Sequence, residues 1–201
     1  MRIPVVIFAA LTALPLLSQE PVVSKAEIWP DTVKRGEMLR QVRGLGEITN
    51  RETVELRIAE TQMKELQAGQ DVSIDTRQQP ILAGKVTRVG SSAVNGVVAV
   101  QVRLNAALPQ GLEPGLNVDG AIQIGRLSNV TYVGRPVFGN ANSEASLFKI
   151  DPDGMHATRV KVRFGRTSVN TIEVVEGLQP GDRVILSDMG AYAGQSRIRL
   201  Q

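Results

Sequence analysis

The strongest constraint on the fold of this chain is a repeated two-residue alternation of apolar side chains with charged or polar ones. Side chains of a β-strand point alternately to the two faces of a sheet, so this spacing predicts strands that bury one face only. Such half-buried strands are typical of antiparallel barrels and sandwiches. The alternating apolar positions are Val54, Leu56 and Ile58; Val98, Val100, Val102 and Leu104; Ile122 and Ile124; and Val160, Val162 and Phe164.

Turn-forming residues separate these segments. The sequence Asp151-Pro152-Asp153-Gly154 precedes the strand that is expected from Ala157. Pro presets its own φ and Gly accepts a positive φ, so this segment predicts a hairpin connection. Asn95-Gly96 is the pair that two-residue hairpin turns favour. A third loop, at residues 177–182, leads into Val184–Leu186.

One segment has the composition of a helix. Glu60–Leu66 holds good helix formers, with Met63 and Leu66 three residues apart on one side. Gly69 is placed to end the helix. We therefore expect two helical turns that cover one end of a small barrel.

Composition excludes several classes of function. The chain has 201 residues, no cysteine and a single histidine, His156, which excludes disulfides, thiolate chemistry and multi-histidine metal centres. Aromatic residues make up 3% of the chain, too few for the stacking platforms that bind single-stranded nucleic acid. The formal net charge is +3, from 23 basic and 20 acidic residues without a long run of one sign. We therefore predict no nucleic-acid partner.

Motifs for catalysis and cofactor binding are also missing from the sequence. It contains no dinucleotide-binding, P-loop, zinc-protease or nucleophile-elbow pattern. Asp151, Asp153 and Gly154 match part of a calcium loop, but the other ligand positions do not follow. His156 follows this turn directly and is expected to be a solvated side chain. We predict no catalytic, cofactor-binding or metal-ligating residue, and no enzymatic activity.

The first 19 residues differ in character from the rest. Arg2 precedes an apolar stretch, Ile3–Leu17, which is shorter than the ~20 apolar residues of a membrane span. A positive start and an apolar stretch of this length are typical of a secretory signal. An uncleaved inner-membrane anchor is the alternative, because Leu16 stands where signal cleavage favours a small residue. Either way, we expect a periplasmic protein.

Four segments form an ordered series along the chain. In the first, residues 31–46, Val33-Lys34-Arg35-Gly36 leads into a strand that ends in Gly44-Leu45-Gly46. The second, residues 56–74, reads LRIAETQMKELQAGQDVSI, and the third, residues 84–125, contains LEPGLNVDG. The fourth, residues 171–188, reads TIEVVEGLQPGDRVILSD. In this order they resemble the periplasmic adaptors, or membrane fusion proteins, of tripartite efflux pumps, of the haemolysin-secretion and macrolide-efflux type.

The chain departs from this family at one place. The adaptors insert a lipoyl-like domain and a long α-helical hairpin after the opening strand, whereas here Thr53 begins the next alternating segment soon after Gly46. No sustained heptad pattern occurs in the sequence. Because Asn50 accepts a left-handed conformation, residues 49–52 are expected to close as a tight turn.

The predicted fold class is mainly β. It consists of a small antiparallel β-barrel with one short helix and a membrane-proximal β domain built from N- and C-terminal segments. The expected organisation is a signal or anchor at residues 1–19, a linker and first strand at 20–40, the barrel at 41–125, and the membrane-proximal domain at 126–201.

The resemblance implies a function by docking. In the family these two modules sit against the periplasmic face of an inner-membrane transporter, and the helical hairpin reaches the outer-membrane channel. The chain is thus expected to be a non-catalytic adaptor-like subunit that binds a transporter permease of the ATP-binding-cassette type, without direct contact to the channel. Self-association is a further expectation, since related adaptors form rings. The alternatives are a free-standing periplasmic module that binds a ligand or regulates a partner, and a hydrolase that uses scattered carboxylates.

Exposed arginines of the module that faces the transporter are the predicted partner contacts. Ordinary solvated charges are the alternative for each of them. The residues are Arg35, Arg126, Arg135, Arg197 and Arg199.

Overall fold

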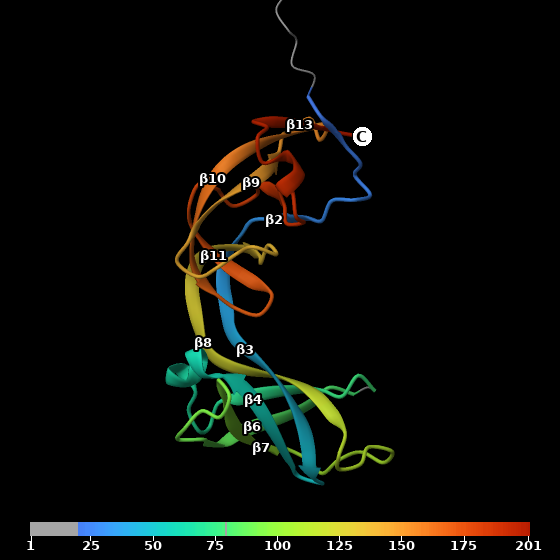
Figure 1. Ribbon diagram of the computed structural model, residues 1–201, viewed down its shortest axis with the longest axis vertical. Helices are drawn as coiled ribbons and strands as arrows, with labels where there is room; N and C mark the ends of the chain where they lie inside the picture. Colours follow the sequence, from blue (N-terminus) through green and yellow to red (C-terminus); the bar gives the residue numbers. More distant parts are fainter. Residues whose placement is uncertain (1–19, 79) are drawn as a thin grey trace, which may run out of the picture.

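The computed structural model describes residues 20–78 and 80–201, and it places them in two lobes along one long axis (Figure 1). Two long antiparallel strands, β3 (Lys34–Asn50) and β8 (Asn117–Gly134), run through both lobes. The predicted signal or anchor at residues 1–19 lies outside the described residues. Within the described part, no helix combines the length and the apolar character that crossing a membrane requires.

Six strands close a small antiparallel barrel, here called the barrel lobe. Neighbouring strands follow the order β8–β3–β4–β7–β6–β5, and β5 pairs again with β8 to complete the ring. Besides parts of β3 and β8, the lobe contains β4 (Thr53–Ala59), β5 (Asp71–Asp75), β6 (Leu82–Val89) and β7 (Val97–Leu104). The predicted alternation is confirmed, since Leu56, Ile58 and Val100 are fully buried in the barrel core. A closed ring leaves no unpaired strand edge.

The remaining strands form an open sheet, here called the C-terminal lobe. It continues from β8 through β11 (Thr171–Glu176), β10 (His156–Thr167), β9 (Glu144–Ile150) and β12 (Arg183–Ile185) to β2 (Pro30–Thr32). Strand β13 (Arg197–Leu200) pairs with β10, and β1 (Val22–Val23) pairs with β13. One core of this lobe lies around Phe164 and a second around Ile198. The predicted second β domain from N- and C-terminal segments is therefore confirmed.

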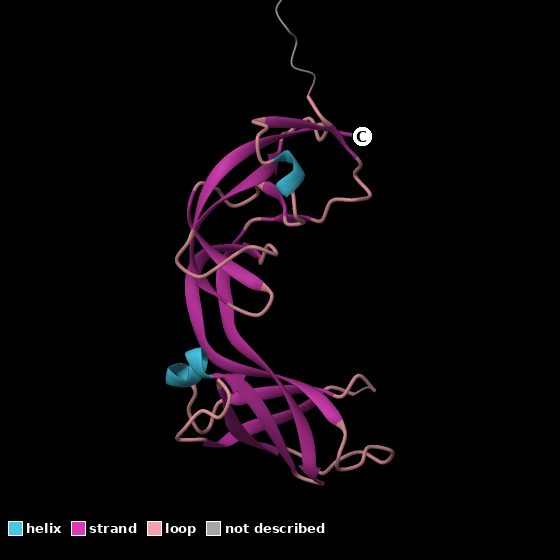
Figure 2. Cartoon of the chain, viewed as in Figure 1, coloured by secondary structure: helices cyan, strands magenta, loops and turns pink. Residues whose placement is uncertain are grey.

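Strands account for most of the described chain, and the helical elements in it are two short 3-10 helices, η1 (Glu60–Glu65) and η2 (Gly190–Tyr192) (Figure 2). The predicted two-turn helix differs from η1 in type and in its end. The N–H of Leu66 bonds to the Met63 carbonyl, and Leu66 then turns away in an extended conformation to enter the barrel core. Six residues form too few bonds to sustain an α-helix, and burial of Leu66 ends the segment before Gly69.

The predicted hairpin turns are present. Asp151–Gly154 joins β9 to β10, and the Gly154 N–H bonds to the Asp151 carbonyl at 2.9 Å. Asn95 and Gly96 both have positive φ, 51° and 76°, as a two-residue primed turn requires.

The chain also turns directly from β3 into β4, as the sequence predicts. Asn50 pairs with Thr53 across this turn. The role predicted for Asn50 is wrong in one respect. Its φ is not positive; instead its side-chain Oδ1 accepts a hydrogen bond from the Glu52 N–H at 2.9 Å. The amide side chain thus closes the turn without a left-handed backbone.

Candidate functional site

The five predicted contact arginines lie in three separate places. Arg35 and Arg126 share the exposed surface of the β3–β8 pair. The Arg35 Nε donates to Asn129 Oδ1 at 2.9 Å, and Arg126 forms an ion pair with Glu37 at 2.9 Å. Both guanidiniums are thus held on one stretch of paired strand.

Arg197 and Arg199 lie on β13, at the far end of the C-terminal lobe. Arg197 pairs with Asp151 at 3.0 Å and approaches Glu20 at 3.7 Å. The backbone N–H of Arg199 donates to the Pro21 carbonyl at 2.9 Å. These contacts fasten the beginning of the described chain to its C-terminal strand.

His156 belongs to the same end of the molecule. Its Nδ1 lies 2.6 Å from Asp153 Oδ2, and its Nε2 lies 3.7 Å from Glu20 Oε2. The hydrogen bond from His156 lowers the pKa of Asp153 to about 2. His156 is 25% exposed and engaged with two carboxylates, so the expectation of a freely solvated side chain is too simple. Among residues 20–78 and 80–201 no cluster of acidic and histidine side chains has the arrangement of a metal site.

Arg135 lies apart from the other four, where the two lobes meet. Its Nε donates to the Gly139 carbonyl at 2.9 Å, and its Nη1 donates to the Ser168 carbonyl at 3.3 Å. Ser168 is buried, and its hydroxyl accepts the N–H of Gln41 at 3.0 Å. The turn between β10 and β11 is thereby fixed against β3.

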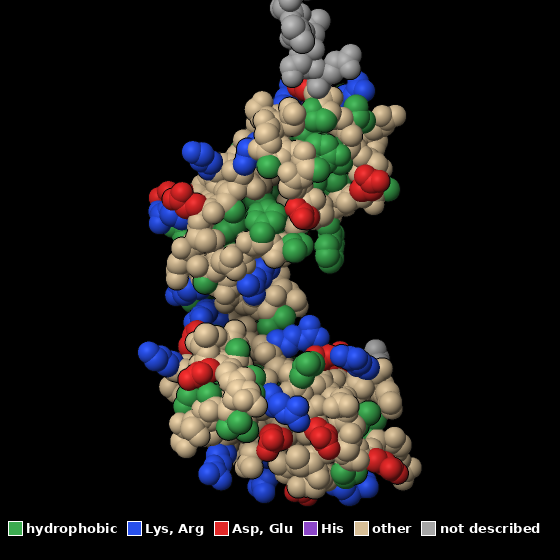
Figure 3. All heavy atoms as spheres, viewed as in Figure 1, with side chains coloured by type: hydrophobic (Ala, Val, Ile, Leu, Met, Phe, Trp, Pro, Cys, Tyr) green, Lys and Arg blue, Asp and Glu red, His purple; other side chains and the backbone are tan. Residues whose placement is uncertain are grey.

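This contact borders a polar hollow of about 350 Å³, here called the junction groove. Its walls come from β3, from η1 and from the turn between β10 and β11. Figure 2 shows η1 at the narrowing between the lobes, and basic side chains gather around this narrowing in Figure 3. The lining residues are Arg40, Gln41, Val42, Arg43, Gln62, Glu65, Ile124, Arg135, Thr167, Ser168, Val169 and Asn170.

Two further arginines of the groove, Arg40 and Arg43, were not among the partner contacts predicted from the sequence. Arg40 forms an ion pair with Glu65 of η1 at 2.7 Å. Arg43 lies 3.1 Å from Asp119 of β8, and Arg77 reaches the same carboxylate oxygen at 3.0 Å. Hydrogen bonds from Arg77 and Arg43 lower the pKa of Asp119 below its ordinary value. No sequence pattern distinguished Arg40 and Arg43, because an arginine on the polar face of a half-buried strand is usually a solvated side chain.

A larger and more apolar hollow, here called the apolar groove, adjoins the junction groove. It has a volume of about 520 Å³ and shares Arg135, Val169 and Asn170 with its neighbour. Trp29, the single tryptophan of the chain, lines it and is 72% exposed, and Val137 is 78% exposed. Large apolar side chains that remain this exposed are a feature of interaction surfaces.

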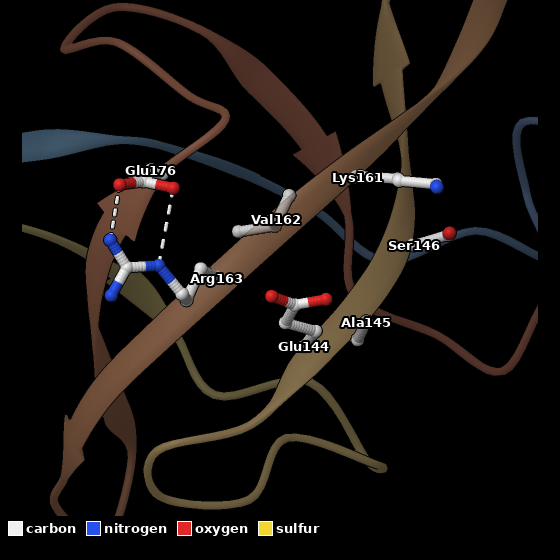
Figure 4. A pocket seen from close by; sticks show the side chains of 7 residues that line it. All are labelled: Glu144, Ala145, Ser146, Lys161, Val162, Arg163 and Glu176. Carbon is white, nitrogen blue, oxygen red and sulfur yellow. Dashed lines mark hydrogen bonds and ion pairs between the residues drawn. The ribbon is translucent and has the colours of Figure 1, made fainter.

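A shallow groove of about 380 Å³ crosses the outer face of β9 and β10 (Figure 4). Arg163 and Glu176 form an ion pair at one side of it, with Arg163 Nε 3.1 Å from Glu176 Oε2. This contact lowers the pKa of Glu176 and raises that of Arg163. Both partners are well exposed and satisfy each other, so this groove has the character of a solvated sheet face.

Comparison with known proteins gives a structural likeness at low sequence identity. No family model and no curated protein matches the sequence. Among solved structures, the chain is similar to MacA from Actinobacillus actinomycetemcomitans, with a TM-score of 0.43 and 17% sequence identity. The alignment covers 68% of this chain and 42% of that one, so the chain matches less than half the length of that MacA.

Proposed function

We propose that the chain is a non-catalytic, adaptor-like periplasmic subunit that docks on an inner-membrane transporter of the ATP-binding-cassette type. The observation that carries the proposal is where the ordered motif segments lie in the fold. Residues 31–46 contribute β2 of the C-terminal lobe and most of β3, which runs through both lobes. Residues 56–74 and 84–125 contribute the other strands of the barrel, and residues 171–188 form β11 and β12 of the C-terminal lobe. These are the two modules that the resembling family holds against its transporter.

The proposal includes a second statement, that the chain does not itself reach an outer-membrane channel. The direct turn from β3 to β4 supports it. The adaptor family places its reaching elements between these strands, and here two residues, Arg51 and Glu52, connect them. Spanning a long distance requires a rigid extended element such as a helical hairpin, and no α-helix occurs in residues 20–78 or 80–201. We therefore assign to the chain a contact with the transporter and none with an outer-membrane channel.

The barrel core bears on the alternative of a ligand-binding module. That alternative requires an apolar cavity in the barrel, but its interior is occupied by tightly packed side chains. Ile48, Ile74 and Ile122 fill its centre and are fully buried. A small apolar ligand would have to displace them, at the cost of the burial that stabilises the lobe.

Co-purification tests the proposal. The tagged full chain is expressed with any ATP-binding-cassette permease whose gene lies next to its own, and inner membranes are solubilised and captured by the tag. We expect the permease in the eluate and the chain in the periplasmic or inner-membrane fraction. If the folded chain fails to retain a folded permease, the proposal is wrong.

A charge-reversal pair locates the contact. Arg35→Glu with Arg126→Glu is expected to reduce capture, because both side chains lie on the same exposed surface. Arg88→Glu on β6 is the control, since Arg88 is also exposed but lies on the barrel wall. Unchanged capture by the double variant would leave the docking function standing and exclude this surface as the contact.

A further inference from the structure

The junction groove brings together positively charged side chains from separate elements of the fold. Arg40 and Arg43 reach it from β3, and Arg135 reaches it from the segment after β8. Glu65 is the one carboxylate in its lining. Three guanidiniums therefore face a hollow that contains a single acidic side chain.

The acidic residues nearby neutralise this positive charge only in part. Glu65 is engaged by Arg40, and Asp119 is shared between Arg43 and Arg77. Arg135 donates two of its five N–H groups to backbone carbonyls, which carry no formal charge, and no ion pair of Arg135 occurs among the described residues. A concave site with surplus charge and low-dielectric walls focuses the field on a mobile ion of opposite sign.

The donors of the groove are also incompletely used. The Nε of Arg40 is buried and has no hydrogen-bond acceptor among the described residues. The side-chain amides of Gln41, Gln62 and Asn170 line the groove and can each donate to an oxyanion. Planar guanidinium forks match the paired oxygens of carboxylate and phosphate groups.

We propose that the junction groove is a binding site for a small oxyanion with at least two negative charges, a phosphate compound or a polycarboxylate. A volume of about 350 Å³ is within the range of small-molecule sites and admits such an ion. The ion would lie between Arg43 of β3 and Arg135, with the amides of the surrounding walls completing its shell. No covalent step is involved.

Binding at this place would tie the two lobes together. Arg40 and Arg43 belong to the stretch of β3 that enters the barrel, whereas Arg135 and Asn170 belong to the C-terminal lobe. The paired strands β3 and β8 continue across this junction, and the Gln41–Ser168 hydrogen bond is a further contact across it. An anion that bridges both sides adds charge-assisted bonds to these contacts.

Isothermal titration calorimetry tests the site, with the full chain at constant ionic strength. Pyrophosphate is the phosphate probe and citrate the carboxylate probe, so that the two arms distinguish the sources of the same chemistry. We expect saturable binding of at least one probe with a stoichiometry of one. Arg43→Gln and Arg135→Gln should each weaken it by roughly tenfold or more, the loss expected for a charge-assisted contact.

Two features of the variants keep the test decisive. Arg135→Gln also removes bonds to two carbonyls and can disturb the fold, but Arg43→Gln leaves Arg77 on Asp119 and should fold normally. Arg88→Gln, on the barrel wall, is the matched control and should bind like the unchanged chain. Absence of saturable binding with both probes overturns the proposal. So does undiminished binding by folded Arg43→Gln, or an equal loss in Arg88→Gln.

Discussion

The two lobes of this molecule are both antiparallel β structures, yet they are stabilised in different ways. The barrel lobe closes on itself around one aliphatic core. The C-terminal lobe is an open sheet with two smaller cores, and its strands carry ion pairs such as Arg166–Glu173 and Arg197–Asp151. Closure removes strand edges and unifies the core, whereas the open sheet keeps unpaired edges and divides its core in two. The C-terminal lobe is thus the one that keeps free strand edges.

The largest expected effect is in the barrel core. Leu56→Ala should destabilise the chain by about 2–5 kcal/mol, because it leaves a cavity in a closed ring. Leu56 packs directly over Gly120, where an added Cβ would lie 2.3 Å from Leu56 Cδ1. Glycine has no side chain that could fill the space. Urea denaturation followed by circular dichroism measures the loss.

The same experiment tests how strongly the lobes are coupled. Since β3 and β8 belong to both, we expect one cooperative transition, shifted as a whole by Leu56→Ala and, less strongly, by Ile198→Ala in a smaller core. Two transitions, of which Leu56→Ala moves only one, would contradict this coupling.

The second prediction concerns two glycines of the loop before β12. Gly177 and Gly181 both have positive φ, 98° and 96°. A Cβ at Gly177 would lie 2.1 Å from the Lys161 carbonyl oxygen, whereas none of the atoms around Gly181 would come within 4 Å. Gly181→Ala should therefore cost about 1–2 kcal/mol from the left-handed backbone alone.

Gly177→Ala adds a backbone clash of about 1–3 kcal/mol to that cost. Thermal denaturation of the two variants measures the difference. An equal loss of stability in both variants would mean that the β10 backbone shifts to accommodate the added methyl group. The C-terminal lobe would then be more adaptable than its geometry indicates.

The third prediction uses acid to separate the lobes. Four described carboxylates have a lowered pKa, and three of them, Asp153, Glu173 and Glu176, lie in the C-terminal lobe, with Asp119 in the barrel. A carboxylate with a lowered pKa stabilises the fold above its ordinary pKa, and this stabilisation is lost as the pH falls through the lower folded value. For Asp153 the window runs from 3.8 down to about 2.

Hydrogen exchange across this pH range measures the response. Amides of β9 to β11 should lose protection at higher pH than those of β4 to β7. Glu173 is the most informative single site, because Arg166 holds its pKa down and its side chain is only 14% exposed. Glu173→Gln should reduce the acid sensitivity of the C-terminal lobe. Simultaneous loss of protection in both lobes would remove the proposed difference between them.

The smallest effect on stability is expected on the exposed surface of the β3–β8 pair. Arg126→Gln breaks an exposed ion pair with Glu37 and should change the free energy of unfolding by at most about 0.5 kcal/mol. Thermal denaturation checks this value. Any loss of transporter capture by Arg126→Gln would then report on docking, whereas a large destabilisation would show that this pair stabilises the strands.

Patterns of local spacing predicted most of the secondary structure correctly. The alternation around Leu56 and Val100 reflects a property of each strand by itself, since neighbouring residues must face opposite sides. The Asn95-Gly96 turn likewise follows from local backbone preferences. The end of η1 did not follow from its composition, because the burial of Leu66 in the barrel outweighed helix propensity.

The candidate site was harder to predict for a related reason. Arg35 and Arg126 were chosen for exposure and do share a surface, but Arg135 belongs with Arg40 and Arg43, which the sequence did not mark. A hollow between lobes depends on which segments distant in the chain meet, and single-strand patterns carry no information about that.

The sequence by itself determined a chain of short half-buried strands with tight turns, because period and turn chemistry are properties of consecutive residues. Only the tertiary structure decided that β3 and β8 continue through both lobes, that Ser168 meets Gln41, and that three arginines face one groove. These features depend on contacts between residues 70 to 127 positions apart, where strand register and bulges set the geometry.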